Sequence, residues 1–503
     1  MKKHPFIWKG LVAGIVLLFI GTAVIPSSGQ KIEKLSLPMS RDNTLYVGGS
    51  GPGNYTKIQD AIDNASDADT VFVFNGTYYE NIIIDKIIML IGDNKNTTII
   101  DGTNGNDSVI TIKAGEVYIK GFTISNSSKY HCSIFFKPNH NGVSIIDNVF
   151  KNNNAAIVLQ NSHNTNISGN TLLDTYGDGI ILINSSNNTI DRNVIINNTG
   201  NNPPNSINIY ANSNNNNIFS NTINQSFFGI NIAFSANHNK ISKNKIKNCE
   251  IGIYLTDVSS NEVSSNTISN NKWGVDLIWQ ANDNDINNNT ISYNIYGIEI
   301  SSSRSSINNT IYHNNFFNNT LHASITSGNN KWDNGYPSCG NYWDDYTGND
   351  FFWGPNQDMN GSDGVGDTHR VIYGGTTNQD HYPLMHPYSI TKLSITIQPK
   401  NFRLLLSIKN VGNTTAFNVQ WNMTIDGFVL FGKDISGGLP KSLVSQEEIE
   451  VSSKYFIMGF GRIVVTATAW ADNAHGVSAR IHGILLLFFF VPIGKEIWKN
   501  PGS

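Results

Sequence analysis

The feature that most constrains the fold is a repeat over residues 157–317. Four similar tetrapeptides stand out in it: Gly229-Ile230-Asn231-Ile232, Gly252-Ile253-Tyr254-Leu255, Gly274-Val275-Asp276-Leu277 and Gly297-Ile298-Glu299-Ile300. Their glycines are 23, 22 and 23 residues apart, at positions 229, 252, 274 and 297. A fixed period of this length indicates a solenoid, in which each unit buries its apolar side against its neighbours.

Two further apolar columns run in phase with these glycines and are five residues apart in every coil. One column holds Ile167, Ile190, Ile218, Ile241, Val263 and Ile286, and the other holds Leu172, Ile195, Ile223, Ile246, Ile268 and Ile291. Each coil therefore has three short runs that alternate with period two and end in Asn, Ser or Gly, which is typical of strands joined by turns. A sandwich would not hold three columns in register. The pattern predicts an all-β chain built on a right-handed parallel β-helix.

The N-terminal region precedes this repeat and has two parts. Lys2, Lys3 and Lys9 lie before an uncharged apolar stretch at residues 10–25, so residues 1–29 are expected to be a signal peptide or an uncleaved membrane anchor. Residues 30–44 then form a linker. Thr56 and Gln59 resemble a capping box, followed by apolar residues at helical spacing. We expect a short helix that caps a β-helix spanning residues 45–330.

The composition changes after residue 331 to Trp, Tyr, Asp and Gly, and the apolar columns stop. We interpret residues 331–389 as a C-terminal cap and linker. Residues 390–492 alternate in strand fashion between turn signals and predict a small antiparallel β-sandwich, with a tail at residues 493–503. The apolar run at residues 484–491 is too short to span a bilayer and is expected to be a buried last strand.

Net charge and cysteine content exclude some classes of partner. The formal net charge is −4 and no basic stripe is present, which argues against nucleic acid. Cys132, Cys249 and Cys339 are odd in number and far apart, so no disulfide framework or CxxC metal knuckle is indicated. We expect no organic cofactor.

The residue between the two apolar positions of each tetrapeptide should point outward and stack about 4.8 Å from its counterpart in the next coil. This outward column contains Ile181, Asn208, Asn231, Tyr254, Asp276 and Glu299, with Tyr210 on the same side. Stacked carboxylates at Asp276 and Glu299 should raise one pKa. Their separation suits the acid and nucleophile of a retaining glycosidase. The alternatives are a ligand-binding face, a cation site or a solvated polar surface.

Two other groups of residues are candidates for structure or for binding. Phe228, Trp273 and Tyr296 precede the Gly-Ile strands with inward parity, which predicts an internal aromatic stack.

Further along, Asp358, Asn360, Asp363 and Asp367 provide oxygen ligands at spacings that a Ca²⁺ loop can use. An EF-hand would need a Glu at its twelfth position, which is missing here. This segment is either a Ca²⁺ site or a polar turn.

Several segments resemble the pectin-lyase-like β-helix superfamily, within it the NosD-type proteins linked to carbohydrate-binding and sugar-hydrolase domains. They are Tyr55-Thr56-Lys57-Ile58-Gln59, Gly76-Thr77-Tyr78-Tyr79-Glu80 and Asn341-Tyr342-Trp343-Asp344-Asp345-Tyr346. The segment Ser407-Ile408-Lys409-Asn410-Val411-Gly412 is similar to adhesion-type β-sandwich modules of microbial surface proteins. The resemblance implies fold more than activity, because this superfamily includes lyases, hydrolases, esterases and binders.

The resemblance also implies copper, and the ligands available are His369, His381, His386, Met359 and Met385. They form no compact motif, which argues against copper. The catalytic motifs of pectinesterases, pectate lyases and polygalacturonases are missing as well. We therefore expect an exported periplasmic or cell-surface protein that binds a glycan or cell-envelope polymer without catalysis. It would touch the membrane through residues 10–25 if these are uncleaved. The alternatives are a polysaccharide hydrolase or lyase using Asp276 and Glu299, and a copper-binding accessory protein.

Overall fold

The structure is a computed structural model that describes residues 43–498 except 104, 199, 201–202, 302–303, 376, 389–390, 401–402, 413–415, 417, 432–433, 445–446, 453–456, 472–473 and 488. The expected signal segment at residues 1–29 and nearly all of the expected linker lie outside the described residues. Within the described part, no helix is both long and apolar enough to cross a membrane. The chain divides into two compact units, Met1–Thr222 and Ile223–Ser503.

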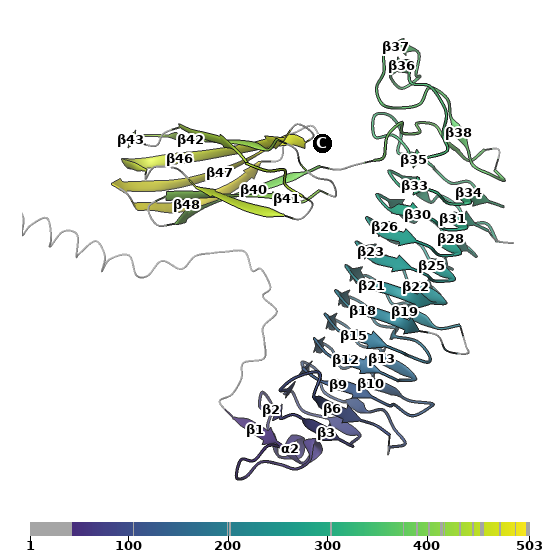
Figure 1. Ribbon diagram of the computed structural model, residues 1–503, viewed down its shortest axis with the longest axis vertical. Coiled ribbons are helices and arrows are strands. Elements are labelled where there is room, and N and C mark those ends of the chain that lie inside the picture. Colours follow the sequence, from purple (N-terminus) through teal and green to yellow (C-terminus); the bar gives the residue numbers. More distant parts are fainter. Residues whose placement is uncertain are drawn as a thin grey trace, which may run out of the picture. The chain divides into compact units, whose positions relative to one another are not determined.

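In the first unit, three parallel sheets run along a solenoid (Figure 1). Sheet A has the order β1 (Thr44–Val47), β2 (Thr70–Val73), β5 (Met89–Gly92), β8 (Tyr118–Lys120), β11 (Ser144–Ile146), β14 (Asn166–Ser168), β17 (Thr189–Asp191), β20 (Asn217–Phe219). Sheet B has the order β3 (Gly76–Tyr78), β6 (Thr98–Asp101), β9 (Thr123–Ser125), β12 (Val149–Lys151), β15 (Thr171–Leu173), β18 (Val194–Asn198). Sheet C has the order β4 (Ile82–Ile84), β7 (Ile110–Ile112), β10 (Cys132–Phe136), β13 (Ala155–Gln160), β16 (Ile180–Ile183), β19 (Asn205–Tyr210).

The second unit contains the same three kinds of parallel sheet. Its part of sheet A is β23 (Lys240–Ser242), β26 (Glu262–Ser264), β29 (Asp285–Asn287), β32 (Thr310–Tyr312). Its part of sheet B is β24 (Lys245–Lys247), β27 (Thr267–Ser269), β30 (Thr290–Ser292), β33 (Asn315–Phe317), β35 (Tyr342–Trp343), and β21 (Thr222–Ser226) spans the sequence boundary between the units. Its part of sheet C is β22 (Phe228–Ala233), β25 (Ile251–Thr256), β28 (Trp273–Ile278), β31 (Tyr296–Ile300), β34 (Leu321–Ile325). The predicted parallel solenoid is confirmed.

The apolar columns form the core. Ile167, Ile190 and Ile218 pair directly in sheet A and are fully buried, and so are Val263 and Ile286. Removing these side chains from water is the main favourable term in folding, at about 25 cal/mol per Å² of apolar surface. The period of the sequence thus sets both the pairing register and the core.

Buried asparagines tie each coil to the next through their side-chain amides. In the second unit the backbone N–H groups of Asn244, Asn266, Asn289 and Asn314 each donate to the Oδ1 of the asparagine one coil further on, at 2.8–3.0 Å. In the first unit Asn148, Asn170 and Asn193 make the same kind of ladder. The ladders satisfy backbone groups at the corners between strands, which explains why Asn recurs at equivalent corners of successive coils.

Helix α2 (Ile58–Asn64) covers the first coil as predicted, with Ile58, Ala61 and Ile62 buried. The predicted capping box at Thr56 is wrong. Lys57 occupies the N-cap position without a side-chain bond, and the Glu80 carboxylate accepts from the N–H groups of Ile58 and Gln59 at 2.9 and 3.0 Å. The cap comes from 22 residues away because β3 returns the chain to the start of the helix.

The C-terminal cap contains two small antiparallel pairs and the ends of the ladders. The pairs are β36 (Phe352–Trp353) with β37 (Met359–Asn360), and β38 (Arg370–Val371) with β39 (Gln379–Asp380). Asn341, the last asparagine of its ladder, donates its N–H to Asp380 Oδ2 at 2.8 Å. Asp380 is fully buried, and burial raises its pKa to about 7. The segment that the sequence marks only by composition is thus bonded to the last coil.

The antiparallel sheets predicted at the C-terminus are present. One contains β40 (Leu393–Lys400), β41 (Arg403–Asn410) and β45 (Glu448–Ser452), and the other contains β44 (Asp434–Gly438), β42 (Gln420–Asp426), β46 (Met458–Ala471), β47 (Ala474–Leu487) and β48 (Phe489–Trp498), with β43 (Val429–Phe431) beside β46. Two expectations are wrong here. Residues 493–498 belong to β48, because they pair with β47. Residues 484–491 form a hairpin end with Leu486 exposed, since the chain reverses within the run.

Candidate functional site

The outward column of sheet C is the site around which most candidate residues gather in the second unit. The strand register places Tyr254 beside Asp276 and Asp276 beside Glu299, which confirms the predicted neighbours. Asn231 lies beside Tyr254. The coils approach closely at the preceding glycines, because a Cβ at Gly274 would lie 2.5 Å from the carbonyl oxygen of Gly297. Glycine at this position therefore fixes the height at which the outward residues stack.

Asp276 is much more buried than an outward position suggests. Asp276 is 8% exposed. Its buried Oδ1 has no hydrogen-bond partner among the described residues. Burial, and secondly the neighbouring Glu299 carboxylate, raises the pKa of Asp276 to about 7. A carboxyl group in this setting stays protonated below about pH 7 and can share its proton with a partner.

Two aromatic rings lie beside Glu299. The rings of Trp273 and Tyr296 stack with centroids 5.8 Å apart and planes 13° apart. The Trp273 indole N–H donates to Glu299 Oε2, and Lys272 Nζ lies 4.1 Å from the Trp273 ring centroid. Both aromatic residues are half-buried. The predicted internal stack is therefore wrong for Trp273, because its ring is half-buried and its indole N–H reaches the outward Glu299 carboxylate.

The remaining sheet C candidates lie in the first unit or at the start of the second. In the first unit, Asn208 donates its side-chain amide to Asp178 Oδ2 at 2.8 Å, and Tyr210 pairs with Ile183 in the adjacent strand. Burial, followed by the Asp178 charge, raises the pKa of Tyr210. In the second unit, Phe228 contacts Tyr254 at a centroid distance of 5.0 Å. Asp178, which the sequence presents only as part of a Gly-Asp-Gly turn, is the group that orients Asn208.

The proposed Ca²⁺ ligands do not converge in the structure. The two oxygens of Asp367 accept from the N–H groups of Phe351 and Phe352, at 2.9 and 3.1 Å. Asp363 accepts from the N–H groups of Val365 and Gly354. Asp358 and Asn360 are exposed. The carboxylates of Asp363 and Asp367 hold separate turns of the cap, so Ca²⁺ binding stays a prediction.

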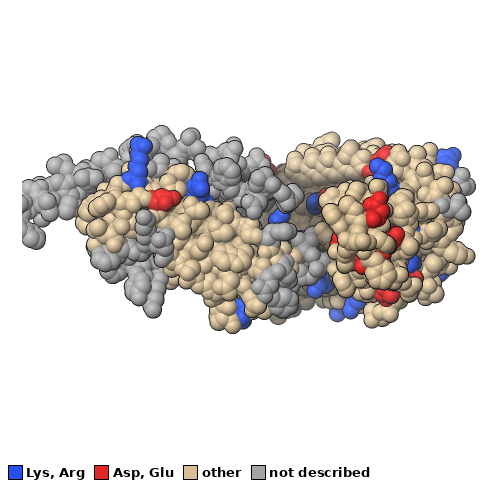
Figure 2. All heavy atoms as spheres, turned by 90° about the horizontal axis from the view of Figure 1, so that it is seen from above, with Lys and Arg blue, Asp and Glu red and all other residues tan. Residues whose placement is uncertain are grey.

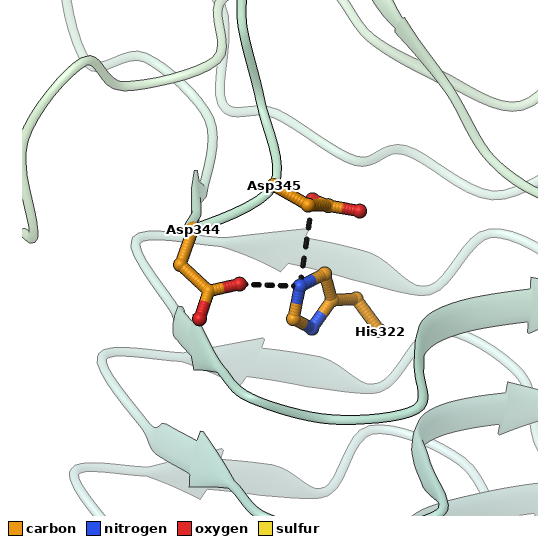
Figure 3. A group of neighbouring side chains, drawn as sticks. All are labelled: His322, Asp344 and Asp345. Carbon is orange, nitrogen blue, oxygen red and sulfur yellow. Dashed lines mark ion pairs between the residues drawn. The ribbon is translucent and has the colours of Figure 1, made fainter.

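A group that sequence reasoning missed lies at the last coil, where His322 faces Asp344 and Asp345 (Figure 3). His322 Nε2 is 2.7 Å from Asp344 Oδ1 and 3.4 Å from Asp345 Oδ1. Arg370 holds Asp345 with two nitrogens, at 2.7 and 3.0 Å, and lies over the Trp343 ring. The acidic pair after Trp343 was visible in the sequence, but nothing near His322 signalled its partner.

The tautomer of His322 decides what this group can bind. Asn319 Oδ1 accepts from Asn294, so its Nδ2 faces His322 Nδ1 at 3.1 Å and donates to it. The proton of the neutral ring is therefore on Nε2, where it points at Asp344. Burial lowers the pKa of His322, which favours this neutral form. In this form Nε2 donates to the Asp344 carboxylate, so the group joins the cap to the last coil.

Much of the solenoid sequence matches a known family. A model described as periplasmic copper-binding protein (NosD) matches residues 62–241 and 201–348. The chain belongs to the NosD family. This NosD family member is also 35% identical over 100 residues to a cell surface glycoprotein of Methanothermus fervidus. The match covers 20% of this chain and 16% of that relative.

Three solved structures are similar to this NosD family member at low sequence identity. The catalytic domain of a GH87 alpha-1,3-glucanase in complex with nigerose is 10% identical, with a TM-score of 0.41, over 61% of this chain and 70% of that one. DFA-IIIase from Arthrobacter chlorophenolicus in complex with DFA-III is 13% identical, with a TM-score of 0.42, over 56% and 84%. Dettilon tailspike protein is 14% identical, with a TM-score of 0.44, over 88% and 93%.

The family description implies copper, and the described side chains can be tested for it. Burial raises the pKa of the Cys132 thiol to about 11 and that of the Cys249 and Cys339 thiols to about 12, so in the metal-free chain none of them is a thiolate at neutral pH. His322 does not fit either, because its Nε2 is protonated. His369 and His381 lie beside each other in the cap, with ring centroids 4.7 Å apart.

Proposed function

We propose that this NosD family member is an exported, non-catalytic β-helix protein that binds a glycan or another cell-envelope polymer. The binding surface is the outer face of sheet C in the second unit. The observation that carries the proposal is the stacked pair of Trp273 and Tyr296 beside the Glu299 carboxylate. Half-buried rings of this kind offer an apolar surface to a sugar ring, and a carboxylate accepts hydrogen bonds from its hydroxyl groups.

The surface chemistry supports an uncharged, hydroxyl-rich polymer. Charged residues make up 14% of the sequence. Most of the described surface seen from above in Figure 2 is uncharged, and several Asp and Glu side chains gather on the right of the view. Along sheet C in the second unit, outward polar residues repeat at every coil, from Asn231 to Glu299. Such a periodic surface suits a ligand that itself repeats.

Export is supported by the relatives and by the N-terminal sequence. The family is described as periplasmic, and the relative from Methanothermus fervidus is named a cell surface glycoprotein. Lys2, Lys3 and Lys9 before the apolar stretch at residues 10–25 have the pattern of a signal segment or anchor. If this segment stays attached, it places the protein at a membrane.

Catalysis by Asp276 and Glu299 is the second candidate function. Strands in adjacent coils are about 4.8 Å apart, close to the separation of about 5 Å in retaining glycosidases. A pKa of about 7 would also suit Asp276 as the acid. The burial of Asp276 weighs against this role, because a general acid must reach the glycosidic oxygen.

A glycan-array screen combined with reducing-sugar and unsaturated-product assays tests both functions. We expect wild-type protein to bind a polysaccharide without turnover, and Glu299→Gln to weaken that binding about tenfold. Asp276→Asn should change binding less, because its carboxyl group is covered. Binding that is the same in wild type, Asp276→Asn and Glu299→Gln would end the proposal for this face. Turnover that both substitutions abolish would make the enzyme the better account.

A further inference from the structure

A row of three side chains lies at the corner that follows sheet C in the second unit. Phe234, Asp257 and Trp279 each come directly after a strand, namely β22, β25 and β28 (Figure 1). The N–H of Phe234 donates to the carbonyl of Thr256 at 3.2 Å, and the N–H of Asp257 donates to the carbonyl of Trp279 at 2.9 Å. The three residues therefore follow the strand register, one per coil. Coils are about 4.8 Å apart, so the two aromatic residues are about 9.6 Å apart along the solenoid.

The two aromatic rings contribute little to folding. Phe234 is 60% exposed and Trp279 is 55% exposed, so neither ring belongs to the core. Their backbone is left-handed, with φ angles of 53° and 48°. This conformation costs free energy for a residue with a Cβ, and Asn adopts it most easily. The corresponding corners of the first unit hold Asn161, Asn184 and Ala211. An aromatic residue here neither fills the core nor eases the turn, which indicates a ligand outside the chain.

Polar groups separate and follow the two rings. Asp257 is exposed between them in the register, and the exposed residues Ser235 and Gln280 come directly after Phe234 and Trp279. A protein partner would cover a continuous apolar surface, whereas Asp257 interrupts the apolar surface here. Aromatic faces that alternate with hydrogen-bonding groups suit a sugar chain, because each sugar has apolar C–H faces and a rim of hydroxyl groups.

We propose that Phe234, Asp257 and Trp279 bind an extended β-1,4-linked polysaccharide that runs along the solenoid axis with one sugar per coil. The coil spacing of about 4.8 Å is close to the length of one pyranose unit in such a chain. Successive sugars of this chain are turned over relative to each other, so every second sugar presents the same face. Phe234 and Trp279, two coils apart, stack on two such equivalent sugars. Asp257 accepts hydrogen bonds from the sugar between them.

This row rests on the proposed function for the class of its ligand, and it adds the linkage and the direction of the chain. The test is calorimetric titration of the full chain with cellohexaose and with chitohexaose, compared with maltohexaose, whose α-linked chain curves. We expect a β-1,4-linked hexasaccharide to bind at least tenfold more tightly than maltohexaose. Phe234→Ala and Trp279→Ala should each raise its dissociation constant about tenfold, the loss expected for one aromatic stacking contact. Trp279→Phe, which keeps a ring, should retain most of the affinity.

Tyr293→Ala is the matched control. Tyr293 is 61% exposed and has a left-handed φ of 57°, but it follows β30 of sheet B. This variant should bind as the wild type does, and circular dichroism checks the fold of every variant. The proposal is overturned if neither β-1,4-linked hexasaccharide binds, if maltohexaose binds as tightly as they do, or if Phe234→Ala and Trp279→Ala bind as Tyr293→Ala does.

Trp273→Ala separates this row from the proposed binding face of sheet C. Weakened binding in Trp273→Ala alone supports the sheet C face and overturns the row. Weakened binding in Phe234→Ala and Trp279→Ala alone supports the row and counts against the sheet C face. Weakened binding in all three variants supports both.

Discussion

Asp276 shows how a single residue can report on the candidate site. It lies beside Glu299 in the register, is buried, and has a pKa raised to about 7 by burial and then by Glu299. The strand register, and with it the proximity of the Asp276 and Glu299 carboxylates, follows from the period of the sequence. The burial does not, because it depends on how the side chains around Asp276 pack over it, which strand alternation does not specify.

The raised pKa of Asp276 gives a prediction on stability. Between about pH 4 and about pH 7 the folded chain holds a proton on Asp276 that the unfolded chain has released. The free energy of unfolding that the raised pKa of Asp276 contributes is therefore greatest below about pH 4. This contribution is lost as the pH rises to about 7. Asp276→Asn cannot titrate, so its melting temperature relative to wild type should rise across this window.

Circular dichroism melts at a series of pH values measure this difference. Asp380, whose pKa is also raised to about 7, is present in both proteins, so its contribution cancels. Parallel pH profiles for wild type and Asp276→Asn would contradict the raised pKa of Asp276.

At the scale of elements, Glu80 couples the segment between strands β3 and β4 to helix α2. Its carboxylate accepts from two N–H groups of the first helical turn. We expect Glu80→Ala to destabilise the helical cap by about 1–2 kcal/mol, because both donors lose their acceptor and the helix N-terminus loses a nearby negative charge. Hydrogen exchange over residues 43–65 should speed up, while Asp85→Ala, an exposed carboxylate nearby, should leave it unchanged. Equal exchange in both variants would rule out this capping role.

Asp380 accepts hydrogen bonds in the C-terminal cap, much as Glu80 does at helix α2. It accepts from the N–H groups of Asn341 and Tyr382 and from the Trp343 indole, at 2.8, 3.1 and 2.9 Å. Asp380→Ala leaves these buried donors without an acceptor, which costs about 3 kcal/mol or more. Hydrogen exchange should rise in residues 331–388 and stay as in wild type within residues 43–222. Asp358→Asn, an exposed carboxylate of the cap, is the control. Protection that survives Asp380→Ala would contradict the role of Asp380 as a ladder end.

Helix α2 and the C-terminal cap show which contacts can be predicted from the sequence and which cannot. The existence of α2 follows from apolar spacing at Ile58, Ala61 and Ile62, which local physics sets. Its cap does not, because Glu80 arrives through the topology of the first coil. Likewise, Asn341 and Asp380 are 39 residues apart, and no local pattern relates them.

For the whole molecule, the 22- and 23-residue period decides the architecture, because three apolar columns in phase can be buried together only in stacked coils. The same period identified the outward column of sheet C, including Asp276 and Glu299. The sequence missed the orientation of Trp273, since strand parity does not show that the indole N–H can reach Glu299. It also missed the pairing of His369 with His381, because the intervening turn has no periodic signal.

The central claim is that the aromatic and acidic face of sheet C binds a glycan. The most direct measurement is the dissociation constant for the best polysaccharide from the array, compared between Trp273→Ala and Trp353→Ala. Both substitutions remove a partly exposed tryptophan from the second unit, and only Trp273 contacts Glu299. We predict that Trp273→Ala weakens binding at least tenfold, about 1.4 kcal/mol, and that Trp353→Ala does not. Equal affinities in the two variants would contradict the claim.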